Sequence, residues 1–336
     1  MTITCFGEYL LRLSPPETQR VVQASSFEAV YGGAEANVAA ALAGFGESAR
    51  YVTALPDNPL GDAALAHLRS LGLDVSGVKR SGERLGVYYL EKGADLRPSK
   101  VVYDRRHSSI SEAGAGDFDW GALLSGSDWF FFTGITPAVG AGLPGTVEEA
   151  LSVCREKNIR TACDLNYRPT LWDADTAGQV MRSLVRGLDL LVANEEHANL
   201  LLNVRSSAED EDERLRGIAV SLCREYGVKK AALTLRRSIT ADVNSVSAVY
   251  YDSETGVFVR GKEQMIRRIV DRVGGGDAFT GALLYALDKG YDPQYAVDFA
   301  AAANAFKHSI GGDALIASAD EIARLAQSDG TVRLMR

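Results

Sequence analysis

Three consecutive glycines followed by an aspartate, at Gly274 to Asp277, form the segment of this sequence best suited to chemistry. The glycines let backbone amides approach a phosphate closely, and a helical pattern that starts at Ala278 adds the positive end of a helix dipole. A carboxylate at this position suits phosphoryl transfer, in which a base takes the proton of the attacking hydroxyl while amides bind the transferring group. An aspartate that only caps the helix behind a flexible loop explains the same residues. The segment alone leaves both interpretations open, and it matches neither a Walker P-loop nor a Rossmann fingerprint.

A second pair of glycines, Gly32 and Gly33, lies near the N-terminus, where another helical pattern begins. Asn37 follows four residues later and offers both a donor and an acceptor to sugar hydroxyls. Glycines at a helix start also arise from ordinary turn chemistry. This segment by itself therefore does not establish a binding site.

The elements that must position these two segments alternate between strands and helices. The expected strands are 3–6, 50–54, 129–133, 160–164, 190–193 and 230–235, and the expected helices are 38–45, 60–71, 146–157, 176–186, 278–287 and 295–308. Such alternation predicts a mostly parallel sheet with helices on both faces.

Two β-rich segments interrupt this alternation. Short alternating stretches at 10–13, 21–23 and 27–31, and again at 84–91 and 100–105, are typical of hairpins exposed on one side. We expect them to form a small sheet that serves as a lid. The expected domains are residues 1–8, 36–83 and 109–336 for the main α/β domain, and 9–35 and 84–108 for the lid.

The composition is that of a folded enzyme, with 46% hydrophobic and 24% charged residues in a chain of 336. A net charge of −8 argues against a nucleic-acid binder, which would present a basic surface. No apolar run approaches the length of a membrane span and no signal core is present, so a cytoplasmic location without membrane contact is expected. The four cysteines lack metal or redox spacing and are expected to be buried free thiols. The acidic run 209–213 is expected to be a solvated helix face or loop.

Taken together, the two glycine segments resemble the two signatures of the ribokinase-like (PfkB) carbohydrate kinase family. They occur in the family's order and separation, and the similarity extends over nearly the whole chain. The resemblance implies a ribokinase-like doubly wound α/β/α sandwich with a small β-sheet lid. It also implies that Asp277 is the catalytic base, that the amides of Gly274, Gly275 and Gly276 form an anion hole, and that ATP and Mg²⁺ take part. A requirement for a monovalent cation stays open.

Within this family the sequence is most similar to the bacterial 2-keto-3-deoxygluconate kinases. The strings that carry the similarity include Leu55-Pro-Asp-Asn-Pro-Leu-Gly61, Arg97-Pro-Ser-Lys-Val-Val-Tyr103-Asp-Arg105, Asp164-Leu-Asn166-Tyr-Arg168-Pro169 and Thr234-Leu-Arg236-Arg237-Ser238. A sugar acid brings a carboxylate, and arginine is its planar partner.

The resemblance assigns the acceptor site to residues of both domains. Arg168 would bind the carboxylate from the end of a core strand, and Tyr103 and Arg105, two apart on one strand, would share a face toward the substrate. A surface charge is the alternative for Arg105, which has Arg106 beside it. The full set of expected substrate-binding residues is Gly32, Gly33, Asn37, Tyr88, Tyr103, Arg105, Asn166 and Arg168.

The nucleotide side follows from the same resemblance. The segment Asn194-Glu195-Glu196-His197 corresponds to the family's Asn-x-x-Glu, which organises magnesium and water, but its fourth residue is a histidine. Since Mg²⁺ prefers oxygen ligands, we expect Glu195 to act on the metal through water. The expected cofactor-binding residues are Asn194, Thr234, Arg236, Gly274 and Gly276. The other histidines, at 67, 107 and 308, are expected to be structural or on the surface.

The leading hypothesis is ATP-dependent phosphorylation of 2-keto-3-deoxy-D-gluconate to its 6-phosphate. A kinase of a neutral sugar such as fructose or ribose is the first alternative, and a non-catalytic sugar-acid sensor is the second, since a fold alone never fixes activity. The stereochemistry at C4, gluconate or galactonate series, is left open. A lid with an exposed apolar face favours a homo-oligomer assembled through the lid.

Overall fold

The computed structural model describes residues 1–328. Within that range the main sheet has ten strands, in the order β13-β12-β11-β10-β9-β8-β1-β4-β5, with β14 paired to β12. The strands from β5 to β11 are parallel, and β12, β13 and β14 pair antiparallel at one edge. Their bounds are β1 (Thr2–Phe6), β4 (Ser48–Leu55), β5 (Val78–Arg80), β8 (Trp129–Thr133), β9 (Arg160–Asp164), β10 (Leu190–Ala193), β11 (Lys230–Ser238), β12 (Asn244–Asp252), β13 (Phe258–Arg260) and β14 (Gln264–Ile266).

Two hydrophobic cores lie on the two faces of this sheet. Side chains along a strand alternate between faces, and in β8 Phe131 joins one core while Phe130 and Phe132 join the other. The first core is covered by α1 (Ala34–Gly44), α2 (Pro59–Ser70), α9 (Gly275–Asp288), α10 (Pro293–Lys307) and α11 (Ala319–Gln327). The second is covered by α3 (Trp120–Leu123), α4 (Thr136–Val139), α5 (Leu143–Lys157), α6 (Ala174–Leu184), α7 (Glu195–Leu202) and α8 (Glu211–Tyr226). The expected α/β/α sandwich is confirmed.

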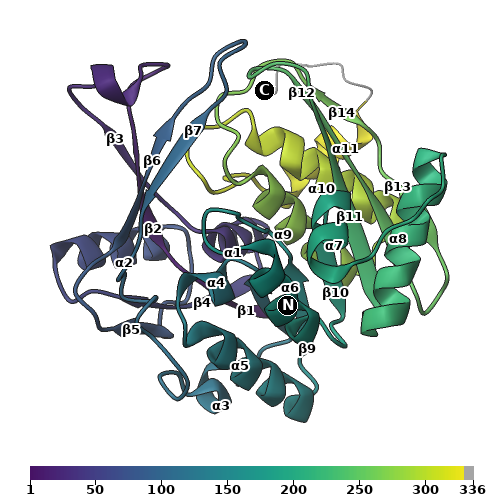
Figure 1. The fold of residues 1–336 in the computed structure, drawn as a ribbon, viewed down its shortest axis with the longest axis horizontal. Helices are drawn as coiled ribbons and strands as arrows, with labels where there is room; N and C mark the ends of the chain where they lie inside the picture. Colours follow the sequence, from purple (N-terminus) through teal and green to yellow (C-terminus); the bar gives the residue numbers. More distant parts are fainter. Residues whose placement is uncertain (329–336) are drawn as a thin grey trace.

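A second sheet projects from this body (Figure 1), as expected from the β-rich segments. Its four strands have the order β3-β2-β6-β7, and β2 and β6 run parallel although about 75 residues of sequence separate them. Their bounds are β2 (Leu10–Ser14), β3 (Glu28–Gly32), β6 (Gly86–Glu91) and β7 (Lys100–Asp104). We call this four-stranded sheet the lid.

One expected lid strand is wrong. Residues Val21–Gln23 form a single turn of 3-10 helix, η1, because the amide of Val21 donates to the Glu91 carboxylate (3.0 Å) instead of to a neighbouring strand. Val22 is 81% exposed there, so its apolar side chain does not indicate the buried face of a strand.

The sequence also gave no separate prediction of helix α8. Its first turn lies in the acidic run, where the Asp210 side chain caps the helix by accepting from the amide of Glu213 (2.9 Å). Acidic residues stabilise a helix start through the dipole. Their density hid the apolar period that begins at Leu215 and continues through Ile218 and Leu222, all buried.

The four cysteines are free and buried, as expected. Among residues 1–328, no helix is both long enough and apolar enough to cross a membrane.

Candidate active site

A cavity of about 730 Å³ lies between the lid and the ends of the main-sheet strands. Every residue that the sequence assigns to a site lines it. The lid and the helix α1 that follows β3 contribute Gly32, Gly33, Asn37, Tyr88, Tyr103 and Arg105. The rest of the main domain contributes Asn166, Arg168, Asn194, Glu195, Thr234, Arg236, Gly274, Gly275, Gly276 and Asp277. Their placement is thus established, whereas their individual roles remain predictions.

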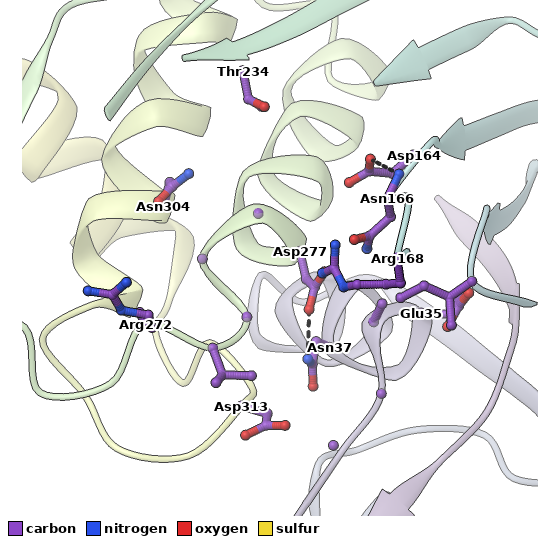
Figure 2. A pocket seen from close by; sticks show the side chains of 18 of the residues that line it. Glu35, Asn37, Asp164, Asn166, Arg168, Thr234, Arg272, Asp277, Asn304 and Asp313 are labelled. Carbon is purple, nitrogen blue, oxygen red and sulfur yellow. Dashed lines mark hydrogen bonds between the residues drawn. The ribbon is translucent and has the colours of Figure 1, made fainter. Parts of the chain in front are cut away.

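Asp277 lies in the first turn of α9 and accepts a hydrogen bond from the Asn37 amide of α1 (2.7 Å), as Figure 2 shows. The two helices approach closely at Gly281, where a Cβ would lie 3.0 Å from that of Ala41. Removal from water raises the pKa of Asp277 to about 7, against the lowering effect of the Asn37 hydrogen bond. A carboxyl with this pKa is suited to proton transfer near neutral pH.

The glycine turn before Asp277 is packed on one side and open on the other. Gly274 has φ +82°, and a Cβ there would lie 1.8 Å from the carbonyl oxygen of Asp313, so only glycine fits. A Cβ on Gly276 would meet nothing within 4 Å. The amides of Gly276 and Asp277 have no hydrogen-bond acceptor in the part of the chain that the structure describes. Free amides at a helix start form a site for an anion.

The end of β9 carries a group of polar residues toward Asp277. Asp164 accepts from the amide of Asn166 (3.0 Å), which holds the turn that brings Arg168 back over the cavity (Figure 2). Burial raises the pKa of Asp164 to about 6. The Arg168 guanidinium donates only to the carbonyl of Tyr167 (3.1 Å) and forms no ion pair among residues 1–328, although its charge favours the ionised forms of Asp164 and Asp277. Arg168 is therefore free to bind an anion.

The lid side chains are held differently from what the sequence suggests. Arg105 is buried and its Nε donates to Glu8 (2.7 Å), while the hydroxyl of Tyr88 donates to Asp313 (2.5 Å). Tyr103 packs between them, with the Tyr88 ring 5.8 Å and the Arg105 guanidinium 5.2 Å from its own ring. In this state of the lid, the hydroxyl of Tyr103 has no protein partner among residues 1–328, whereas the polar ends of Tyr88 and Arg105 do.

Two further arginines, Arg236 and Arg272, line the cavity. Arg236 has no hydrogen-bond or ion-pair partner within residues 1–328, and burial followed by repulsion from Arg272 and Arg168 lowers its pKa. Arg272 donates only to the carbonyl of Ala241 (2.6 Å). Thr234 lies two residues before Arg236 on β11, and its hydroxyl donates to the carbonyl of Ala193 (3.2 Å). The unpaired positive charge is typical of a phosphate site.

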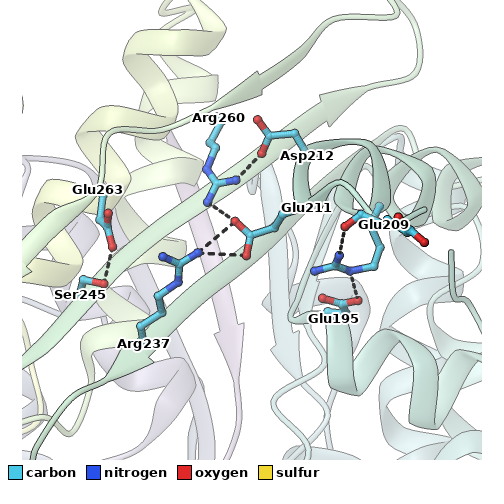
Figure 3. Close-up of polar contacts among 9 residues, drawn as sticks. Glu195, Glu209, Glu211, Asp212, Arg237, Ser245, Arg260 and Glu263 are labelled. Carbon is cyan, nitrogen blue, oxygen red and sulfur yellow. Dashed lines mark hydrogen bonds and ion pairs between the residues drawn. The ribbon is translucent and has the colours of Figure 1, made fainter. Parts of the chain in front are cut away.

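Alternation along β11 separates two adjacent arginines. Arg236 faces the cavity, whereas Arg237 points outward and pairs with Glu211 of α8 (3.2 Å), which also contacts Arg260 (Figure 3). The acidic start of α8 is thus bound to basic strand residues outside the site.

The segment expected on the metal side opens α7. Asn194 caps this helix by accepting from the amide of His197 (2.7 Å), and Glu195 pairs with Arg214 (2.8 Å; Figure 3). Burial, and then Arg168, lower the pKa of His197 to about 4, so its imidazole is neutral at physiological pH. Glu196 is exposed, lines the cavity and has no ion-pair partner within residues 1–328. No group of three or more metal-ligating side chains occurs in that range.

The family model for pfkB carbohydrate kinases matches residues 2–314. The chain belongs to the pfkB family of carbohydrate kinases. Members of this family use ATP and a sugar as substrates.

Two relatives and one more distant structure are similar to this chain. It is 48% identical to the crystal structure of 2-dehydro-3-deoxygluconokinase from Thermotoga maritima, with a TM-score of 0.94 over 98% of this chain and 100% of that one. It is 32% identical to 2-dehydro-3-deoxygalactonokinase of Haloferax volcanii over 96% of each chain. A putative ribokinase II from E. coli, crystallised with ATP and Mg²⁺, shares the fold at 18% identity and a TM-score of 0.78, covering 97% of this chain and 99% of that one.

Sequence reasoning missed several residues that line the cavity. They are Glu8, Glu35, Asp164, Glu196, Arg272, Asn304, His308 and Asp313. Arg272 lies two residues before the glycines of Gly274 to Asp277, and those glycines are the stronger local signal. Asp313 follows Gly311-Gly312, and this third glycine pair was the available signal. His308 lies at the cavity, and its ring Nδ1 is 2.8 Å from the Asn304 carbonyl, which fits its expected structural role.

Proposed function

We propose that this chain transfers the terminal phosphoryl group of ATP to the 6-hydroxyl of 2-keto-3-deoxy-D-gluconate. The observation that carries the proposal is the position of Asp277. Its carboxylate lies in the helix turn that carries two free amides, in a cavity that Arg168, Arg236 and Arg272 also line.

The proton and the phosphoryl group move between neighbouring sites in this proposal. Asp277 accepts the proton of the 6-hydroxyl while the hydroxyl oxygen of the sugar attacks the terminal phosphorus of ATP. The bond between that phosphorus and the leaving ADP breaks. The amides of Gly276 and Asp277 bind the transferring group, whose charge they neutralise. Arg236 and Arg272 bind the remaining phosphates, and Thr234 and Asn194 flank them.

Arg168 supports a sugar acid as the acceptor. An arginine that lines a cavity without a salt bridge to a protein carboxylate can bind a carboxylate of the substrate through charge-assisted hydrogen bonds. A neutral sugar leaves that charge unpaired. The hydroxyl groups of the sugar would be bound by Asn37, Asn166, Gly32 and Gly33. Tyr103 would cover the sugar from the lid, and Arg105 and Tyr88 would shape the lid face of the cavity.

Mg²⁺ suits the part of the cavity that would hold the ATP phosphates. It keeps several waters and is bound mainly by substrate phosphates, which agrees with a site that has few free carboxylates. Glu195 would act through water if its pair with Arg214 opened, and Glu196 is the unpaired carboxylate beside it. Comparing Glu195→Gln with Glu196→Gln for the Mg²⁺ concentration at half-maximal rate assigns the role: the variant with the larger increase identifies the residue.

The C4 epimer, 2-keto-3-deoxy-D-galactonate, is a second candidate substrate, because the relative from Haloferax volcanii is named for it. The decisive experiment measures ADP release with both epimers, fructose and ribose. We expect kcat/KM for the gluconate epimer to be highest and the neutral sugars to be poor. Preference for a neutral sugar would overturn the acid assignment, and binding without ADP release would indicate a sensor.

The organisation of the chain completes the proposal. We assign residues 9–35 and 84–108 to the lid and the remainder to the main domain, and we propose that lids pair in a homo-oligomer. Phe27 and Val102 are exposed on the lid and would be covered by such pairing. Sedimentation of Val102→Asp beside the unmodified protein tests it: unchanged mass rejects pairing through this face. ATP as donor fits a cytoplasmic location.

A further inference from the structure

Lys307 is a lysine with no exposed surface, at the last residue of α10. A buried ammonium group is costly unless it is paired, yet Lys307 forms no ion pair with any of residues 1–328. Instead it donates to two backbone carbonyls, that of Ile310 (3.3 Å) and that of Asp271 (3.5 Å). The ammonium group thus joins the start of the glycine segment to the loop that follows α10.

A buried cluster of charged side chains lies next to Lys307. Arg12 of the lid pairs with both Asp271 (2.6 Å) and Asp313 (2.7 Å), and all three side chains are at most 3% exposed. Two buried carboxylates face one guanidinium, so a protonated Lys307 balances the charge of the cluster when both carboxylates are ionised. Burial lowers the pKa of Lys307, the two carboxylates oppose this effect by favouring the ammonium form, and Arg12 adds to the lowering.

Lys307 also contacts the glycine turn. A Cβ on Gly274 would lie 3.4 Å from Cε of Lys307, and on Gly275 it would lie 2.6 Å from His308, the next residue of the chain. The end of α10 therefore forms the surface against which the turn before Asp277 is shaped. Moving the ammonium group would release this turn and its free amides.

Carbonyl oxygens directed at one cation are the ligands that replace the hydration shell of K⁺ in proteins. We propose that Lys307 is a built-in monovalent cation: its ammonium group occupies a carbonyl-lined position behind the glycine turn and makes an added cation unnecessary. Lys307 is a positioning residue, since it acts on the transferring phosphate only through the turn. The inference rests on the proposed phosphoryl transfer at that turn.

The unmodified protein gives the first test. ADP formation is measured directly by chromatography with tetramethylammonium ATP and Mg²⁺, because coupling enzymes have cation requirements of their own. We expect kcat to change less than about twofold when tetramethylammonium is replaced by K⁺, Na⁺ or NH₄⁺. Turnover that needs K⁺ overturns the inference but leaves the kinase function intact, whereas no turnover with any salt or acceptor overturns the function itself.

Two variants give the second test, with Lys229→Met, at an exposed lysine, as the control. Lys307→Met keeps the stem but removes the charge, and we expect kcat to fall on the order of 10²-fold while KM for the sugar acid changes little, as when an anion-hole donor is lost. Lys307→Ala opens space for an ion, and K⁺ or NH₄⁺ should restore at least about tenfold of its kcat and raise its melting temperature, which tetramethylammonium should not. Unchanged kcat in Lys307→Met, or a Lys307→Ala variant whose melting temperature and rate ignore K⁺, would reject the role.

Discussion

The amide of Asn37 donates to the carboxylate of Asp277 across 2.7 Å, although 240 residues separate them in sequence. This bond connects the two glycine segments directly. It favours the charged carboxylate, whereas removal from water favours the neutral acid, and the balance leaves the pKa of Asp277 at about 7.

The substitution Asp277→Asn keeps the size of the side chain and removes the proton acceptor. We expect kcat to fall on the order of 10³-fold with little change in the dissociation constant of the sugar acid, measured by calorimetry. Asp292→Asn, at the exposed cap of α10, is the control with the same chemical change. A variant that keeps near-normal kcat would exclude Asp277 as the base.

The rate should depend on pH through the same carboxyl. Asp277 must be deprotonated to accept a proton, so kcat/KM should decline tenfold per unit as the pH falls below about 7. Asp164, whose pKa is about 6, supplies the control. In Asp164→Asn the decline should persist and move only toward lower pH, because the Asp164 charge helps to raise the pKa of Asp277; if it disappears, the titrating group is Asp164.

The raised pKa of Asp277 should also make protein stability depend on pH, in the opposite direction to the rate. Since the pKa of Asp277 is raised on folding, its ionisation destabilises the folded state fully above pH 7, and this cost vanishes below the pKa of the unfolded chain. Asp277→Asn should therefore raise the melting temperature more at pH 8 than at pH 5. An equal effect at both values would show that the folded pKa is not raised.

Arg168→Ala tests the choice of substrate. A charge-assisted hydrogen bond contributes about 1.5–3 kcal/mol, so kcat/KM for the sugar acid should fall about 10- to 100-fold. Activity on fructose, however low, should stay the same. Arg106→Ala, at an exposed lid arginine outside the cavity, should affect neither substrate. Equal losses on acid and neutral sugars would assign Arg168 a structural role.

Arg12 should contribute strongly to stability. Arg12→Met leaves the buried carboxylates of Asp271 and Asp313 without their partner, and the free energy of unfolding should fall by about 3–5 kcal/mol in urea titrations. Arg84→Met breaks an exposed pair with Asp104 on the same lid and should cost less than about 1 kcal/mol. Similar losses in both variants would contradict a buried lid-to-core pair.

The sequence predicted the main strands and most long helices, because apolar periodicity is a local signal, and its glycine segments and family resemblance located many, but not all, of the cavity residues. It did not predict how the polar ends would pair. That Arg105 binds Glu8 and that Tyr88 binds Asp313 depends on residues about 97 and 225 positions apart. The helix at Glu211 was hidden for the opposite reason, since its local charges outweighed its apolar period. Side-chain partners across domains are set by packing, which no local pattern records.

The parallel pairing of β2 with β6 has a consequence for how this chain folds. Between these two strands the chain enters the main domain and builds α1, β4 and α2 before it returns. The lid cannot be cut out as one contiguous fragment, and closing so long a loop delays its assembly. We therefore expect the main sheet to form first and the lid last, so that exchanging lids between relatives requires two insertions made together.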